Sequence, residues 1–209
     1  SLQEVLKRAI EQIRENYPEL YHCQIFLLDE GGQNAILKAS TGKIGDLLVE
    51  RNHSVPVGNL SVIGQATLSR QVVIARAADE NWRQRRDDAL PDTQVEAAFP
   101  LTIGDTLIGV LDLQSKDGDL IENKEIPIFQ SLASNIAIAI DNARLFEQTQ
   151  ERLVENQHLI EQTRRAAEQV ERLNRQLTRT FWGDFYKEQP TQTALEVDLV
   201  TQRVSLPSD

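Results

Sequence analysis

The side chains that could do chemistry are scattered along this chain. Its three histidines, His22, His53 and His158, lie far apart in the sequence, and a metal site would need further ligands of the right type. No Ser-His-Asp, Cys-His or paired-carboxylate arrangement is supported by the spacing of these residue types. We therefore expect neither a catalytic centre nor a metal site, and the chain is predicted not to be an enzyme.

One segment does have the residue types of a binding site. Trp82 lies in a long charged stretch, residues 76–94, together with four arginines. These are Arg76, Arg83, Arg85 and Arg86. A tryptophan can anchor a loop over a pocket, arginines can pair with an anionic ligand, and loops of this length are often lids. The alternative is a loop whose tryptophan only folds onto the domain.

The segment after this loop, residues 90–115, predicts a buried β-hairpin. Two apolar strands flank a Gly104-Asp105 turn, and the second is apolar on both faces as far as Asp112. A sheet buried on both faces needs a cover on each. We expect helices on one face and loops on the other, where small side chains leave space for a ligand. The predicted ligand-binding residues are Phe26, Leu28, Arg76, Trp82, Gln94, Ala97 and Phe99.

Shorter patterns predict the elements before this hairpin. Apolar residues recur at helical spacing over residues 2–13, and Pro18 ends that helix. Two β-rich runs around Gly31-Gly32 predict a first hairpin, with Phe26 and Leu28 on the face shared with Ala97. The other expected elements are an edge strand at 53–57, a short helix at 61–70 and a strand at 72–75, while residues 42–52 show no clear pattern.

Composition narrows the class of protein. The chain has 209 residues, a net charge of −10 and one cysteine, Cys23. The acidic charge disfavours nucleic-acid binding, and one cysteine allows neither an intrachain disulfide nor a cysteine-built zinc site. No apolar run approaches the roughly 18–20 residues that cross a bilayer. The absence of methionine indicates a piece of a longer protein, and a single cysteine fits a reducing environment, so we expect a cytoplasmic location.

A long helix is predicted near the C-terminus, because no proline or glycine occurs between Pro127 and Gly183. Its later part carries a narrow apolar stripe at heptad spacing, which is typical of a coiled-coil seam. The first row of this seam is Phe146, Leu153, Ile160, Ala167, Asn174 and Phe181. The second row is Thr149, Asn156, Thr163, Val170 and Leu177.

Three further residues, Leu159, Ala166 and Leu173, widen the stripe on one side. Either the register shifts or additional helices pack there. A single helix that folds back on its own domain is the remaining alternative. After residue 181 the pattern is lost, Gly183 and Pro190 are expected to break the helix, and residues 194–200 and 202–206 alternate like strands.

Three phrases in this order resemble a bacterial GAF domain: VPVGNLSVIGQATLSRQVVIA, LPDTQVEAAFPLTIGDTLIGVLDLQS and LASNIAIAIDNARLFEQTQ. The resemblance implies an α+β fold, in which a central antiparallel sheet has the terminal helices on one face and a small-molecule pocket on the other. It divides the chain into a GAF sensory domain at 1–150, a coiled-coil signalling helix at 151–181, and a linker or the start of a next module at 182–209.

The chain also departs from GAF domains of known ligand. No cysteine matches the bilin-attachment position of the phytochrome type, and Asn123-Lys124 and Phe129 only partly match the cyclic-nucleotide motif. GAF-like methionine-sulfoxide reductases need several cysteines, and this chain has one. Arg76 stands where this subgroup has an acidic residue, and Gln94-Val95 stand where it has Arg-Ser. No particular cofactor is therefore predicted.

The resemblance implies a sensory module of a bacterial signal-transduction protein of the sensor histidine kinase type. It would bind a small molecule or a partner and relay the signal through its C-terminal helix. The expected assembly is a homodimer formed through the N- and C-terminal helices. The alternative is a ligand-free structural module that only dimerises a multidomain signalling protein.

Overall fold

The computed structural model describes residues 1–82, 89–122, 124–188, 196–198 and 203–205. Contacts divide the chain into two compact units, residues 1–150 and 151–209. The elements in chain order are α1 (Leu2–Asn16), β1 (Leu20–Leu28), β2 (Asn34–Ser40), α2 (Gly42–Glu50), β3 (Ser54–Pro56), α3 (Val62–Ser69), β4 (Val73–Arg76), β5 (Val95–Ile103), β6 (Thr106–Ser115), α5 (Ile126–Glu188), β7 (Glu196–Asp198) and β8 (Arg203–Ser205).

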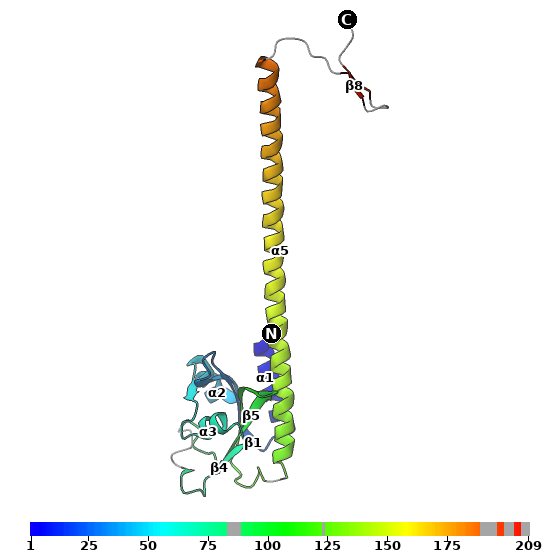
Figure 1. Ribbon diagram of the computed structural model, residues 1–209. Helices are drawn as coiled ribbons and strands as arrows, with labels where there is room; N and C mark the ends of the chain where they lie inside the picture. The colour runs from blue at the N-terminus through cyan, green and yellow to red at the C-terminus, as the bar shows by residue number, and fades with distance from the viewer. Residues whose placement is uncertain (83–88, 123, 189–195, 199–202, 206–209) are drawn as a thin grey trace. The chain divides into compact units, whose positions relative to one another are not determined.

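The first unit is built on a six-stranded antiparallel sheet with the strand order β3-β2-β1-β6-β5-β4 (Figure 1). Strands β5 and β6 are the predicted hairpin, and β6 also pairs along its length with β1. Strand β3 lies at one edge, as Pro56 predicts, because proline cannot donate to a neighbouring strand. The sheet and its helices confirm the predicted α+β fold.

Helices α1 and the first turns of α5 cover one face of the sheet, as predicted (Figure 1). The N-terminus of α1 is closed by a capping box between Ser1 and Glu4. Its buried residues recur at helical spacing, so one side of the helix faces the sheet. From α5, Phe129, Ala133 and Ile140 enter the same apolar core.

Shorter pieces cover the opposite face. Helix α2 packs Leu48 against Phe26 of β1, and α3 packs Ala66 beside Trp82 and Ala98. Ser61 begins α3 by accepting a hydrogen bond from the N–H of the third helical residue, in agreement with the predicted helix at 61–70. Both faces of the central strands are therefore buried.

Helix α2 had no clear pattern in the sequence, because glycine is unfavourable inside a helix. Its glycine at position 45 is required by packing, since a Cβ there would collide with Ser40. Close contact between α2 and β2 therefore explains Gly45, although a glycine by itself argues against a helix.

Helix α5 is longer than predicted. It spans 63 residues, about 95 Å, and passes through Gly183, where we expected it to break. That expectation is wrong because one glycine costs a helix only about 1 kcal/mol relative to alanine. The alternating pattern beyond it was informative, since β7 and β8 pair as antiparallel strands. In the described part of the chain, no helix is both long enough and apolar enough to span a bilayer.

Gly109 is a point of very close contact between central strands. It lies on β6 opposite Leu27 of β1, and a Cβ there would penetrate the carbonyl oxygen of Phe26. We predict that Gly109→Ala lowers the free energy of unfolding by about 1–3 kcal/mol, because backbone must move to make room. Urea unfolding measures this. Gly118→Ala is the control, since its Cβ makes an ordinary contact with Gln94, and equal losses in both variants would contradict the assignment.

Candidate functional site

The best candidate site is a group of buried polar side chains on the sheet face opposite α1 and α5. Five residues form it, and each is at most 3% exposed. They are His22 and Gln24 of β1, Glu96 of β5, and Asp112 and Gln114 of β6, and we call them the polar patch. Burial of charged and amide groups is unfavourable unless they find partners. A sheet face with five of them is therefore unlike the apolar clusters beside it.

Strand register brings the members of the polar patch together. His22 and Glu96 both pair with Gln114, so these three form one row across β1, β6 and β5. Gln24 pairs with Asp112 in the next row on the same face. Directly opposed residues on antiparallel strands have Cβ atoms about 4.5–5.5 Å apart. His22 and Gln114, which are 92 positions apart in the sequence, thus become neighbours.

A chain of hydrogen bonds connects the polar patch to the segment that covers it. Gln114 Nε2 donates to Asp112 Oδ2 (2.8 Å), and Gln114 Oε1 accepts from the Thr93 hydroxyl (2.7 Å). The same hydroxyl lies 3.0 Å from the carbonyl oxygen of Leu90. Thr93 and Leu90 are both 3% exposed, so residues 90–93 shield this end of the patch from solvent. Displacement of residues 90–93 would break this series of hydrogen bonds at Gln114.

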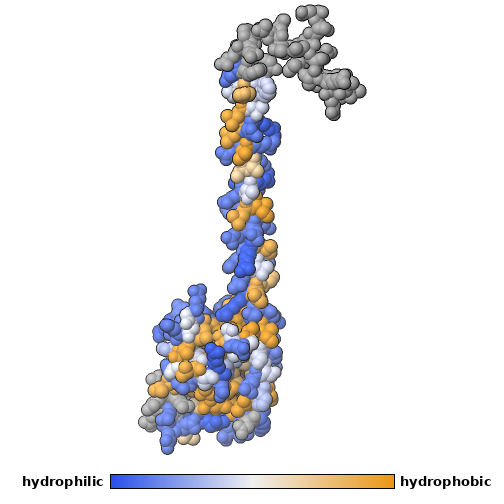
Figure 2. All heavy atoms as spheres, viewed as in Figure 1, coloured by the Kyte–Doolittle hydropathy of each residue, from blue (hydrophilic) through white to orange (hydrophobic). Residues whose placement is uncertain are grey.

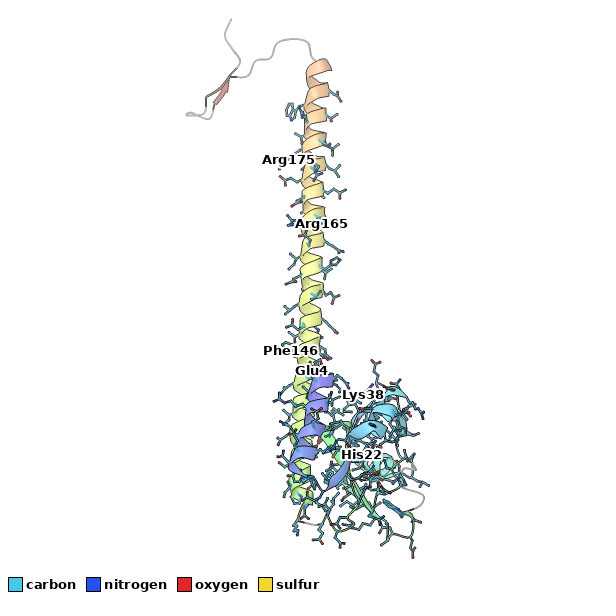
Figure 3. The ribbon with its side chains drawn as sticks, turned by 180° about the vertical axis from the view of Figure 1, so that it is seen from behind. Glu4, His22, Lys38, Phe146, Arg165 and Arg175 are labelled. Carbon is cyan, nitrogen blue, oxygen red and sulfur yellow. The ribbon has the colours of Figure 1, made fainter. Side chains whose placement is uncertain are left out.

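At its other end, the polar patch is joined to the start of α2. His22 Nε2 lies 3.0 Å from Ser40 Oγ, and its Nδ1 lies 3.3 Å from Thr41 Oγ1. The backbone N–H of Cys23 donates to Thr41 Oγ1 as well (3.0 Å). Two hydroxyl groups thereby hold His22, which is buried inside the domain (Figure 3). Within the described residues, no three His, Cys, Asp or Glu side chains are grouped to hold a metal ion.

Gln24 provides the observation that points most directly to a ligand. Its side chain is 1% exposed, and its Nε2 has no hydrogen-bond partner among the described residues. A buried donor without an acceptor costs about 1–3 kcal/mol. A ligand oxygen that enters the polar patch would recover this energy, so the patch is suited to a molecule with a hydrogen-bond acceptor.

The predicted ligand-binding residues are divided between the two faces of the sheet. Ala97 and Phe99 lie in the helix-side core, where the Phe99 ring packs 5.7 Å from that of Phe129. Phe26 and Leu28 belong to the opposite cluster, beside α2. Our prediction that Phe26 and Leu28 share a face with Ala97 is wrong. Alternation defines two sets of residues in each strand, but it does not say which set meets the helices.

The other three predicted residues lie in different surroundings. The guanidinium group of Arg76 donates to the carbonyl oxygen of Ile121 (2.6 Å), and Gln94 is exposed at the start of β5. Trp82 is 7% exposed and packs among apolar residues of the α3 side, which agrees with the alternative that its ring folds onto the domain. The neighbouring Arg83, Arg85 and Arg86 lie outside the described residues.

Sequence reasoning did not identify the polar patch as a site, although a signal was present. Asp112 and Gln114 are two apart and therefore share one face of a strand that is otherwise apolar. Gln24 and Glu96 interrupt apolar strands in the same way. Polar residues at alternate positions of a buried strand require partners, but only the strand register shows that these strands supply them to one another.

Matched substitutions at the two glutamines of the polar patch test this description. We predict that Gln24→Leu does not lower the free energy of unfolding, because the Nε2 it removes has no partner and its burial is unfavourable. Gln114→Leu should lower it by about 1–3 kcal/mol, because Asp112 and Thr93 each lose a hydrogen bond. Urea unfolding compares the two, and an equal loss at Gln24 would mean that its Nε2 has a protein partner.

Comparisons with known proteins agree with this fold. A GAF domain of a phosphoenolpyruvate-protein phosphotransferase from Coxiella burnetii is 20% identical, with a TM-score of 0.61 over 71% of this chain and 87% of that one. The second GAF domain of DevS from Mycobacterium smegmatis is 15% identical, with a TM-score of 0.57 over 71% and 99%. Free methionine-R-sulfoxide reductase from Neisseria meningitidis, solved with its substrate, is 17% identical, with a TM-score of 0.58 over 69% and 81%.

At these identities, the solved structures establish only the shared fold. No curated protein matches the chain in sequence. The family model described as GAF domain matches residues 1–141, which is more than half of the chain and includes every strand of the six-stranded sheet. This chain therefore belongs to the GAF domain family.

Proposed function

We propose that this chain is a regulatory GAF module that binds a small polar molecule at the polar patch and relays its binding through a dimeric α5. The observation that carries the proposal is the buried Gln24 side chain, whose Nε2 lacks a partner among the described residues. It lies on the sheet face away from α1 and α5, beside two carboxylates and a second glutamine. Burial of polar side chains lowers the stability of a fold unless they find partners, so stability alone does not explain the polar patch.

Binding would act on the segment that covers the polar patch. A molecule that reaches Gln24 must displace or reorder residues near Thr93, whose hydroxyl is hydrogen-bonded to Gln114. The same segment continues directly into β5, which pairs with the central strand β6. Occupancy of the patch would therefore change the position of a strand whose other face packs on α5.

The proposed relay needs a dimer, and two surfaces support one. In the first unit, a groove of about 350 Å³ between α1 and α5 is lined largely by apolar residues, among them Val5, Ala9 and Ile136. In the second unit, α5 exposes apolar side chains at intervals along its length, including Leu153 and Ile160 at 49% and 68% exposure (Figure 2). Both helices would thus contribute to a homodimer, as in the sensor histidine kinase arrangement expected from the sequence.

Polar residues in the seam suit this dimer to signalling. Asn156 and Thr163 occupy seam positions that apolar residues would fill in a maximally stable coiled coil. A helix pair of marginal stability can pass between two arrangements for a small change in free energy. The proposed output module would follow α5 in the full-length protein.

A catalytic role is less well supported, although free methionine-R-sulfoxide reductases share the fold. Thiol chemistry requires an accessible thiolate. Cys23 is the single cysteine of this chain and is fully buried. Burial, with a smaller contribution from the charge of Asp112, raises the pKa of the Cys23 thiol to about 12. We therefore propose a binding module without enzymatic activity.

The raised pKa of Cys23 predicts a pH dependence of stability. The unfolded chain loses the thiol proton near pH 8.5, whereas the folded chain keeps it to about pH 12. Stability should therefore fall as pH rises through this window, by up to about 1.4 kcal/mol per pH unit. Cys23→Ala removes this dependence, so the stability difference between wild type and variant should narrow between about pH 9 and about pH 11.

Urea unfolding at a series of pH values measures that difference, and tyrosine and lysine titration is common to both proteins and cancels. At neutral pH the folded wild type should also resist alkylation by iodoacetamide, because the thiol is buried and protonated. A constant difference across the pH series, or rapid alkylation of the folded chain, would show that Cys23 is accessible.

A thermal-shift screen with nucleotides, amino acids and tetrapyrroles tests ligand binding. A molecule that binds only the folded chain raises its melting temperature, by an amount that corresponds to about 2.7 kcal/mol at a hundred times its dissociation constant. Gln24→Leu should abolish the shift, while Gln130→Leu on the exposed side of α5 should preserve it. A shift that survives Gln24→Leu would place the ligand elsewhere.

The competing function is a ligand-free dimerisation module. The hydrogen bonds from Thr93 through Gln114 to Asp112 favour it, because they satisfy part of the polar patch without a ligand. A chain that dimerises normally and gains no stability from any compound in the screen would support this alternative.

A further inference from the structure

The apolar stripe of α5 changes register inside the second unit. Its first part follows one heptad register, with seam residues separated by alternating steps of three and four. These seam residues are Leu153, Asn156, Ile160 and Thr163. Continued unchanged, this register would place Ala167 and Asn174 in the seam and would leave Leu173 outside it.

A different register fits the sequence after Thr163. Its seam residues, again in steps of four and three, are Ala166, Val170, Leu173, Leu177 and Thr180. Val170, Leu173 and Leu177 are 51–69% exposed in the single chain, so a partner can bury them. The second register therefore replaces the amide of Asn174 with the leucine at position 173 in the seam.

The two registers meet at a step of three residues, from Thr163 to Ala166, where an unbroken heptad needs four. Such an interruption is equivalent to the insertion of three residues into a coiled coil, and it overwinds the helices locally. The exposed hydrophobic residues on both sides of this step keep the stripe continuous. Leu173, which only widens the stripe of the first register, is explained by the second one.

The charges on α5 favour a second copy of the same helix as the partner. None of the seam positions in either register segment carries a charge, so identical residues can face one another without repulsion. Charged side chains instead pair within the helix: Arg164 with Glu161 (3.0 Å) and Glu168 (2.8 Å), and Arg175 with Glu171. Arg165 and Arg175, labelled in Figure 3, extend from positions outside the seam.

Parallel pairing also suits the polar seam residues. In a parallel pair in register, Asn156 faces Asn156 of the second copy and Thr163 faces Thr163. An amide pair can then form hydrogen bonds in the seam, whereas a shifted register would bury the amide against apolar residues without a partner.

We propose that α5 forms a parallel, in-register coiled coil with α5 of a second copy, and that this coil changes register between Ile160 and Ala166. The inference rests on the dimer of the proposed function and adds the position at which its packing changes. The overwound segment gives the two helices an alternative packing, in which one register extends through the whole seam. A rotation of the helices that starts in the sensory domain would be taken up at this segment.

Disulfide mapping in the full 209-residue chain tests the register. Single cysteines are introduced at three pairs of neighbouring positions: Leu159 and Ile160, Ala166 and Ala167, and Leu173 and Asn174. Seam positions bring the two Cα atoms close enough for a disulfide, and flanking positions do not. Before the break, we expect faster cross-linking at 160 than at 159. After the break, we expect it to be faster at 166 than at 167 and at 173 than at 174. The position of fastest cross-linking within each heptad thus moves by one residue across the break.

Two controls accompany these variants. The parent chain should not cross-link, because its own Cys23 is fully buried, and Glu168→Cys lies outside the seam of both registers. The double variant Leu173→Asn/Asn174→Leu exchanges the two residues that distinguish the registers. It should extend the first register past Thr163, and single cysteines placed at 166 or 167 in this background should report it as a shift of the cross-linking maximum from 166 to 167.

Each result decides a different point. Maxima at 160, 167 and 174, or at 159, 166 and 173, would show one unbroken register and overturn the proposed change while keeping the dimer. Cross-linking at one position only would indicate antiparallel pairing and overturn the proposal. A chain that sediments as a monomer and cross-links at no position would remove the dimer itself, and with it the relay in the proposed function.

Discussion

The pairing of β1 with β6 at the centre of a six-stranded sheet is the constraint on which the rest of the structure depends. These strands are buried on both faces, so each face must be covered by other parts of the chain. Two long amphipathic helices cover one face with a continuous apolar core. The other face has only short helices and loop segments, and its side chains are correspondingly more varied.

This asymmetry gives the two faces of the sheet different kinds of packing. The helix side is filled with aliphatic and aromatic residues, and Gly109 allows its strands to approach closely. The opposite side has the polar patch, where directional hydrogen bonds join Gln114 to Thr93 and Asp112, while the buried Nε2 of Gln24 has no partner among the described residues. Specific hydrogen bonds can be exchanged for bonds to a ligand, whereas a close-packed apolar core cannot admit one without strain.

Helix α5 serves both parts of the molecule. Its first turns contribute Phe129 and Ile140 to the core of the first unit, and these residues are almost fully buried. Beyond residue 150, its apolar residues are exposed and its charges pair along the helix. The helical conformation is continuous, while the partner required to bury its apolar stripe changes from the sheet to the proposed second copy.

The sequence alone determined most of the elements, since strand alternation, helical spacing, Ser61 and Pro56 depend on neighbours within a few residues. Helix α2 is the exception, because its glycine at position 45 is explained only by close packing on Ser40. It also contained the GAF resemblance and the heptad stripe. It could not decide which alternate residues of β5 meet the helices, and Ala97 and Phe99 were assigned to the wrong side for that reason. The polar patch depends on the register of three strands that are distant in the chain, so only the tertiary structure could assemble His22, Glu96 and Gln114 into one row.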